Sequence, residues 1–292
     1  MILSIVSVLF AGYLASCSRG SVSAETTAVL LGGDGKTESY PCDVAIGDIG
    51  KLYGLDILGA AVLNGQIVYC GGYDGGYHSE CFKNEGLDWI EFESMNVARS
   101  YFTLTTLGDK ILAAGGDTQQ EITATVEVFD GTSWKLQNYK LTSARKSHCA
   151  VSFSESQVML IGGVAAGVLS VVEVYSIDEG FIAELPSMPT ARYGLACSMF
   201  KGEIWTAGGY NGGFLDGVEV FDSFTITWRS GPRLTKGRYY LTMEVLDNSL
   251  VVFGGSGGGG SYSLEVLDGE LWREEPLQYY HFNHASVSIP CN

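Results

Sequence analysis

Short apolar runs that end in a Gly-Gly pair recur along the chain. Six such pairs occur, and the steps between successive pairs are 39, 44, 47, 46 and 46 residues. The pairs are Gly32-Gly33, Gly71-Gly72, Gly115-Gly116, Gly162-Gly163, Gly208-Gly209 and Gly254-Gly255. A nearly constant period of this length indicates an array of structural repeats. Glycine suits the end of each run, because it adopts positive φ without the steric cost that a side chain would impose.

The residues after each pair predict further strands. In the later repeats an alternating strand follows ten or eleven residues on, as at 126–130 and 218–222. An aromatic residue lies seven to nine residues after the glutamate of this strand, and an arginine-led strand then runs to the next pair. We expect Trp89, Trp134, Trp228 and Trp272 to pack on outer strands. Each period therefore predicts four strands.

Four-stranded repeats of this period, without helical patterns between them, are typical of β-propeller blades. The Gly-Gly pair, the Val-Glu-Val-Phe-Asp strand at 218–222 and the following Trp228 resemble the kelch repeat. The resemblance covers residues 25–292 and implies an all-β, six-bladed kelch β-propeller with four antiparallel strands per blade. The first repeat departs from the pattern, with Asp43 where the others have glutamate and no tryptophan.

The two ends of the chain predict how the ring closes. Residues 281–289 resemble the first strand of a repeat, whereas residues 28–33 resemble a second strand. We expect the C-terminal strand to complete the N-terminal blade, because joining the termini in one sheet removes an open edge.

Residues 1–24 differ from the rest of the chain. An apolar run from Ile2 to Leu14, too short to span a bilayer as a helix, precedes a group of small residues. This pattern predicts a cleaved signal peptide, and hence a secreted protein without a membrane span. Two alternatives stay open: residues 14–17 resemble a bacterial lipobox, which would leave a lipid anchor on Cys17, or the run is no signal and the protein is cytoplasmic.

Six cysteines follow residue 24. Cys70 and Cys81 flank a tight connection in the second blade, and Cys42 and Cys291 lie near the predicted closure, so both pairs are disulfide candidates. Cys149 and Cys197 fall on inner strands of adjacent blades, one position out of register, and we expect them to be buried thiols.

The charge balance limits the possible partners. With 17 Lys+Arg against 33 Asp+Glu, the formal net charge is −16. A negative field of this kind repels phosphate, which argues against nucleic acid and anionic membranes as partners.

One face of the predicted ring carries the candidate binding residues. If the strands of a blade are named a to d outward from the centre, the b-c and d-a loops emerge on the same face. Positions 16 or 17 residues before the Gly-Gly pairs hold an arginine in four blades and Leu55 in the second, and the C-terminal strand has a histidine in the matching place. Tyrosines directly follow two of the pairs. The candidate partner-binding residues are Arg99, Arg145, Arg192, Arg238, His281, Tyr73 and Tyr210.

These arginines allow two interpretations. A ring of guanidinium groups at the channel mouth would attract an acidic motif of a protein partner, since arginine offers a planar fork of donors. Equivalent Arg and Tyr positions in intracellular kelch substrate receptors often contact acidic peptides, so the resemblance implies the same. Alternatively, each arginine pairs with the glutamate of its own blade, Glu127, Glu173, Glu219 or Glu265.

The prediction that follows is a non-catalytic, secreted protein-binding module that presents its b-c and d-a loops. No nucleophile and base motif, paired carboxylates or phosphate loop is evident, and we expect neither a cofactor nor a metal. His148 and His284 occupy matching positions and are interpreted as polar packing residues. A first alternative is a mutarotase or epimerase for sialic-acid-type sugars, because some exported kelch propellers act on sugars. A second is a kelch substrate adaptor of a ubiquitin ligase.

Overall fold

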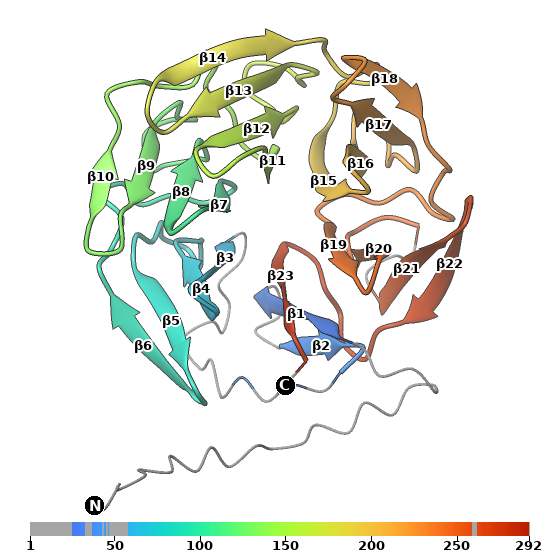
Figure 1. Cartoon of the computed structure of the whole chain (residues 1–292), viewed down its shortest axis with the longest axis horizontal. Coiled ribbons are helices and arrows are strands. Elements are labelled where there is room, and N and C mark those ends of the chain that lie inside the picture. Colours follow the sequence, from blue (N-terminus) through green and yellow to red (C-terminus); the bar gives the residue numbers. More distant parts are fainter. Residues whose placement is uncertain are drawn as a thin grey trace, which may run out of the picture.

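The computed structural model describes residues 25–32, 37–42, 44, 46, 58–258 and 262–291. Every named element within them is a strand, and the strands form six antiparallel sheets arranged as a ring (Figure 1). The predicted signal peptide with Cys17, and also Asp43 and Leu55, lie outside the described residues. The prediction of an all-β, six-bladed propeller is confirmed.

Blades two to six each contain four strands that follow one another in the sheet. Blade two contains β3 (Gly59–Leu63), β4 (Gln66–Cys70), β5 (Cys81–Glu85) and β6 (Asp88–Phe92). Blade three contains β7 (Thr103–Leu107), β8 (Lys110–Ala114), β9 (Val126–Phe129) and β10 (Trp134–Leu136). Blade four contains β11 (Cys149–Ser152), β12 (Gln157–Ile161), β13 (Val172–Ser176) and β14 (Gly180–Leu185). Blade five contains β15 (Tyr193–Phe200), β16 (Glu203–Tyr210), β17 (Val218–Asp222) and β18 (Thr227–Ser230). Blade six contains β19 (Thr242–Leu246), β20 (Ser249–Phe253), β21 (Ser263–Asp268) and β22 (Leu271–Pro276).

Blade one joins the two ends of the described chain. Its sheet has the order β2 (Glu38–Tyr40), β1 (Thr26–Gly32) and β23 (His284–Pro290), so three of its strands lie within the described residues. β23 pairs with β1 over seven positions, from Thr26 opposite Pro290 to Gly32 opposite His284. The predicted closure by the C-terminal strand is confirmed.

The Gly-Gly pairs allow neighbouring blades to approach closely. Gly115 and Gly116 have φ values of 62° and 102°. A Cβ on Gly115 would lie 2.6 Å from the carbonyl oxygen of Arg145, and the N–H of Gly116 donates to that same oxygen at 2.8 Å. The pair therefore ends β8 and connects blade three to the start of blade four, which leaves no space for a side chain.

Apolar side chains fill the space between adjacent blades. One cluster joins Val68 of blade two to Leu104, Ile111 and Phe129 of blade three. The outer tryptophans also contribute a polar contact: the indole N–H of Trp134 donates to the carbonyl oxygen of Glu93 at 2.9 Å. Trp89, Trp228 and Trp272 donate in the same way to Ile46, Pro186 and Pro232. The predicted packing role of these four tryptophans is confirmed.

Between described cysteines, disulfides join one predicted pair and one unexpected pair. Cys70 and Cys81 are register partners on β4 and β5, and their sulfur atoms are bonded at 2.02 Å. The predicted Cys42–Cys291 bond is wrong, since Cys291 is a free thiol. The physical reason is that β1 lies between β2 and β23, and strands separated by a third strand are roughly 9–10 Å apart, beyond disulfide reach.

Cys149 and Cys197 were expected to be buried thiols, and this prediction is also wrong. They form a disulfide between β11 and β15, with a Cα–Cα distance of 6.0 Å. The inner strands of blades four and five lie side by side around the channel (Figure 1). Cys149 and Cys197 differ by one position when each is counted from the start of its own strand, but this offset does not prevent their side chains from meeting.

Candidate functional site

The four repeated arginines each form an ion pair with the glutamate of their own blade. The N–O distances are 2.7 Å for Arg99–Glu127, 2.6 Å for Arg145–Glu173, 3.0 Å for Arg192–Glu219 and 2.6 Å for Arg238–Glu265. The four arginine side chains are at most 1% exposed. The structure therefore shows the paired arrangement, with the guanidinium groups buried inside the blades.

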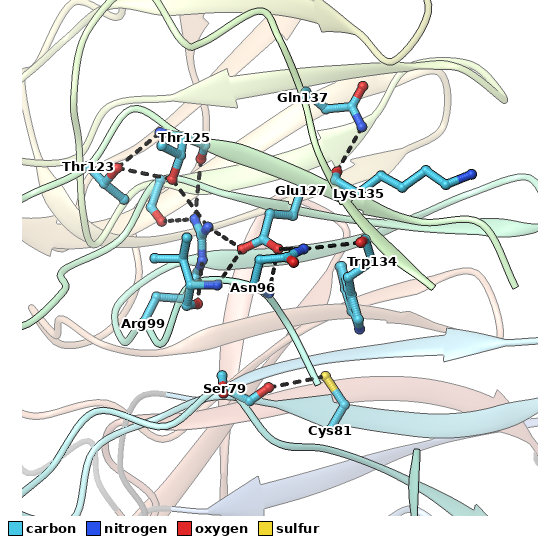
Figure 2. Close-up of polar contacts among 12 residues, drawn as sticks. Ser79, Cys81, Asn96, Arg99, Thr123, Thr125, Glu127, Trp134, Lys135 and Gln137 are labelled. Atoms are coloured by element: carbon cyan, nitrogen blue, oxygen red, sulfur yellow. Dashed lines mark hydrogen bonds and ion pairs between the residues drawn. The ribbon is translucent and has the colours of Figure 1, made fainter. Parts of the chain in front are cut away.

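Figure 2 shows how fully the pair in blade three is hydrogen-bonded. Arg99 also donates to the carbonyl oxygens of Gly115 and Thr125, at 2.7 and 3.2 Å. Glu127 accepts the backbone N–H groups of Asn96 and Val97, at 2.7 and 3.0 Å. Burial lowers the pKa of the Arg99 guanidinium, and the charge of Glu127 opposes this shift. The pair thus fixes the d-a connection to the third strand of the blade.

His281 occupies the corresponding place in blade one. Its side chain is fully buried, and its Nε2 lies 3.0 Å from a carboxylate oxygen of Glu38. Burial acts to raise the pKa of Glu38, but hydrogen bonds from His281 and from the backbone of Gln278 and Tyr279 outweigh it and lower the pKa. Glu38, and not the predicted Asp43, is therefore the acidic partner of this blade.

The register explains why sequence reasoning missed Glu38. It lies opposite Leu30, two residues before Gly32, just as Glu127 lies opposite Ala113, two residues before Gly115. The loop before β2 is shorter than in the later blades, so counting ten or eleven residues from the Gly-Gly pair passes beyond it. In blade two the same register position is taken by Phe82, which stacks on Tyr69 at 5.0 Å.

The b-c loops and the d-a connections lie on the same face, as the topology predicted. Isolated bridges join them in three blades: Ser100 to Asp117, Lys146 to Val164, and Tyr239 to Ser256. Tyr73 lies on this face, where it contacts Tyr77 with a ring-centroid distance of 5.1 Å and is 39% exposed.

Tyr210 belongs to a larger aromatic surface on the same face. Its ring lies 5.7 Å from Tyr193, 5.6 Å from Phe214 and 5.6 Å from Tyr239. Tyr239 continues the contacts to Tyr240 at 4.6 Å and to Phe282 at 5.7 Å. We call these residues the aromatic patch: Tyr193, Tyr210, Phe214, Tyr239, Tyr240 and Phe282. Phe214 is 51% exposed and the other members are half-buried.

Sequence reasoning found only Tyr210 of this patch. A usable signal was present, because Tyr193 directly follows Arg192 and Tyr239-Tyr240 directly follows Arg238. Residues next to the buried arginine lie at the start of an inner strand, and those starts surround the mouth of the channel.

Backbone hydrogen bonds connect the blades at this mouth. The N–H of Ser147 donates to the carbonyl oxygen of Tyr101, that of Gly194 to Ser147, and that of Tyr240 to Gly194, at 2.7–2.8 Å. The Tyr240 ring lies 5.6 Å from that of Tyr101, and its hydroxyl is 3.1 Å from that of Ser147. Residues from blades three, four, five and six are thus linked across this end of the channel.

The channel behind the mouth is a cavity of about 670 Å³, lined by the first strands of all six blades. His148 and His284 lie in its wall, where their Nε2 atoms lie 3.1 and 3.0 Å from the hydroxyls of Thr103 and Thr242. Burial holds the pKa of both imidazoles well below the usual value, so both are neutral near pH 7. Their interpretation as polar packing residues agrees with these contacts.

Glu244, on β19, also lines the channel, a position that no sequence pattern indicated. Its Oε1 accepts the hydroxyl of Ser286 on β23 at 2.6 Å. Burial raises the pKa of this carboxyl above its usual 4.5, against the opposing effect of hydrogen bonds from Ser286 and Ser288. The channel therefore contains an ionisable group between blades six and one.

Glu244→Gln is expected to remove part of the pH dependence of stability. An acid with a higher pKa in the folded than in the unfolded state binds its proton more tightly when folded. The free energy of unfolding then falls as the pH rises from about 4.5 through the folded-state pKa. The variant retains an acceptor for Ser286 but does not titrate. The urea concentration at the unfolding midpoint, measured from pH 4 to pH 8, should fall more steeply with rising pH for the wild type than for the variant. The prediction is contradicted if the two proteins show parallel pH profiles.

Among the described residues, no group of three or more His, Cys, Asp or Glu side chains could hold a metal ion. In the same part of the chain, no helix is long and apolar enough to cross a membrane.

Comparisons with known proteins agree with the repeat pattern and the ring. A family model described as Kelch motif matches residues 98–135 and 191–235. A comparison with curated proteins gives no significant match. The solved structure titled "Structure of YjhT" is similar with a TM-score of 0.71 at 14% identity, over 88% of this chain and 96% of that chain. At this identity the likeness concerns the fold. Two stretches of the chain thus match the kelch motif, and its six antiparallel blades form the closed ring of a β-propeller.

Proposed function

We propose that the protein is a non-catalytic binding module that holds a protein partner on its aromatic patch. The observation that carries this proposal is the continuity of six aromatic rings from blades five, six and one on the loop-bearing face. Aromatic side chains dominate the energetic centres of protein interfaces, since they bury a large area at a small cost in conformational entropy. The rigid ring beneath them keeps this surface preorganised.

An acidic motif is not the partner chemistry that this face favours. The repeated arginines are buried, and nearby cations are paired with carboxylates, Lys146 with Asp117 and Lys236 with Glu274. The net charge of −16 further disfavours an acidic partner. We therefore propose a neutral or basic protein segment with exposed apolar side chains.

Secretion is part of the same proposal. Two disulfides within the ring are compatible with an oxidising compartment, whereas cytosolic proteins of this size seldom carry structural disulfides. This supports the secreted module over the ubiquitin-ligase adaptor. The Arg192–Glu219 pair offers little support to the sugar mutarotase, because both groups are buried and already satisfied by each other.

The combined substitution Tyr210→Ser and Phe214→Ser tests the binding surface. Partners are captured from culture medium by chemical cross-linking and identified by mass spectrometry, and affinity is then measured with the purified partner. We expect the combined variant to weaken binding at least tenfold, because it removes two rings from the centre of the patch.

The matched control is Phe224→Ser, which removes a 95% exposed aromatic side chain on the turn between β17 and β18. It should bind like the wild type. Equal binding by all three proteins, or an equal loss in both variants with unchanged melting temperatures, would refute the aromatic patch as the binding surface.

A further inference from the structure

The central channel has a carboxyl group without a cationic partner. Glu244 lies in the middle of β19, and its neighbours across the gap between blades are the hydroxyls of Ser286 and Ser288. Among the described residues that line the channel, Glu244 is the only acid, and none is Lys or Arg. The two histidines of the wall are neutral near pH 7. No side chain of the described wall therefore balances an ionised Glu244.

The rest of the wall offers many hydrogen-bonding groups. Hydroxyls from five blades line the cavity, those of Thr103, Thr105, Ser152, Ser198, Thr242, Ser286 and Ser288. Each inner strand is also the terminal strand of its sheet, so the backbone groups on its free edge add donors and acceptors. A volume of about 670 Å³ is within the range of small-molecule sites. The cavity thus suits a compact ligand rich in hydroxyl groups.

These two features select one class of ligand. A buried carboxylate is stabilised most by a directly paired cation, since the pair regains the electrostatic energy that desolvation removes. We propose that the channel binds a small polyhydroxylated compound with a primary ammonium group, which pairs with Glu244 while its hydroxyls bond to the serine and threonine side chains. The proposal does not depend on the protein partner, although Tyr240 belongs both to the aromatic patch and to the lining of this cavity.

Calorimetric titration of the full chain with three matched sugars tests the proposal at pH 7. Glucosamine supplies the ammonium and the hydroxyls, glucose lacks the ammonium, and N-acetylglucosamine replaces it by a neutral amide. We expect saturable one-to-one binding of glucosamine and at least tenfold weaker binding of the other two. Glu244→Gln should weaken glucosamine binding at least tenfold, and Ser286→Ala should weaken it several-fold.

Glu203→Gln is the matched control, because Glu203 forms an ion pair with Arg229 far from the channel lining. It should bind glucosamine like the wild type. The proposal is overturned if glucosamine shows no saturable binding, if glucose binds equally well, or if Glu244→Gln retains the wild-type affinity while its thermal unfolding is unchanged.

Discussion

Replacing Glu127 by alanine is expected to lower the free energy of unfolding by about 3–5 kcal/mol, the usual result of removing one partner from a buried ion pair. Arg99 would remain fully buried with its charge unbalanced. The backbone N–H groups of Asn96 and Val97 would also lose their acceptor. Urea unfolding followed by tryptophan fluorescence measures the change.

Two further variants separate the causes of this loss. Glu203→Ala removes a carboxylate from an exposed pair with Arg229, and should cost at most about 1 kcal/mol. The double variant Arg99→Met with Glu127→Leu leaves no unbalanced charge and should regain part of the stability. A loss below about 1 kcal/mol for Glu127→Ala would mean that the pair is not structural.

Removing the disulfide between blades four and five is expected to have the second large effect. The bond joins residues separated by 48 positions, and closing a loop of that length restricts the unfolded chain by roughly 4 kcal/mol. The double variant Cys149→Ala with Cys197→Ala should lose about this much stability. The bond between Cys70 and Cys81, with a separation of 11, should contribute roughly 3 kcal/mol by the same reasoning.

Cys291→Ala is the control, because it removes a cysteine that forms no disulfide. Its unfolding midpoint should match that of the wild type under oxidising conditions. Reduction with dithiothreitol breaks both bonds and should lower the wild-type midpoint below that of the Cys149/Cys197 variant. If reduction and the double substitution both leave the midpoint unchanged, the link between the inner strands does not stabilise the ring.

The location of the arginines changes the expected mode of binding. The sequence places one arginine at the start of each inner strand in blades three to six, and the resemblance to kelch receptors implies contacts with acidic peptides. The structure directs these side chains into the blades, where Arg192, for example, donates to the carbonyl oxygens of Gly208 and Gly217. The residues that follow them, such as Tyr193 and Tyr239, are the ones that reach the face.

The periodicity of the chain by itself determined the architecture. Each repeat is one four-stranded unit that contacts mainly its neighbours, so evenly spaced local signals were sufficient to predict six blades and their order. The period-two strands, the positive-φ glycines and the unmatched strands at the two ends also predicted the closure of β23 on β1. The Cys70–Cys81 bond was predictable for the same reason, since both residues belong to one hairpin.

Only the tertiary structure decided what lies between blades. The Cys149–Cys197 bond, the contact of Glu244 with Ser286 and the assembly of the aromatic patch all join residues from different repeats. Strand alternation shows that a side chain lies on one side of its sheet, but the distance to the next sheet depends on the twist and radius of the closed ring. Burial of the arginines is a further case, because a guanidinium at the edge of a strand can turn towards solvent or towards its own blade. The carbonyl oxygens of the Gly-Gly turn and the glutamate of the third strand, brought together only in the folded blade, direct it inward.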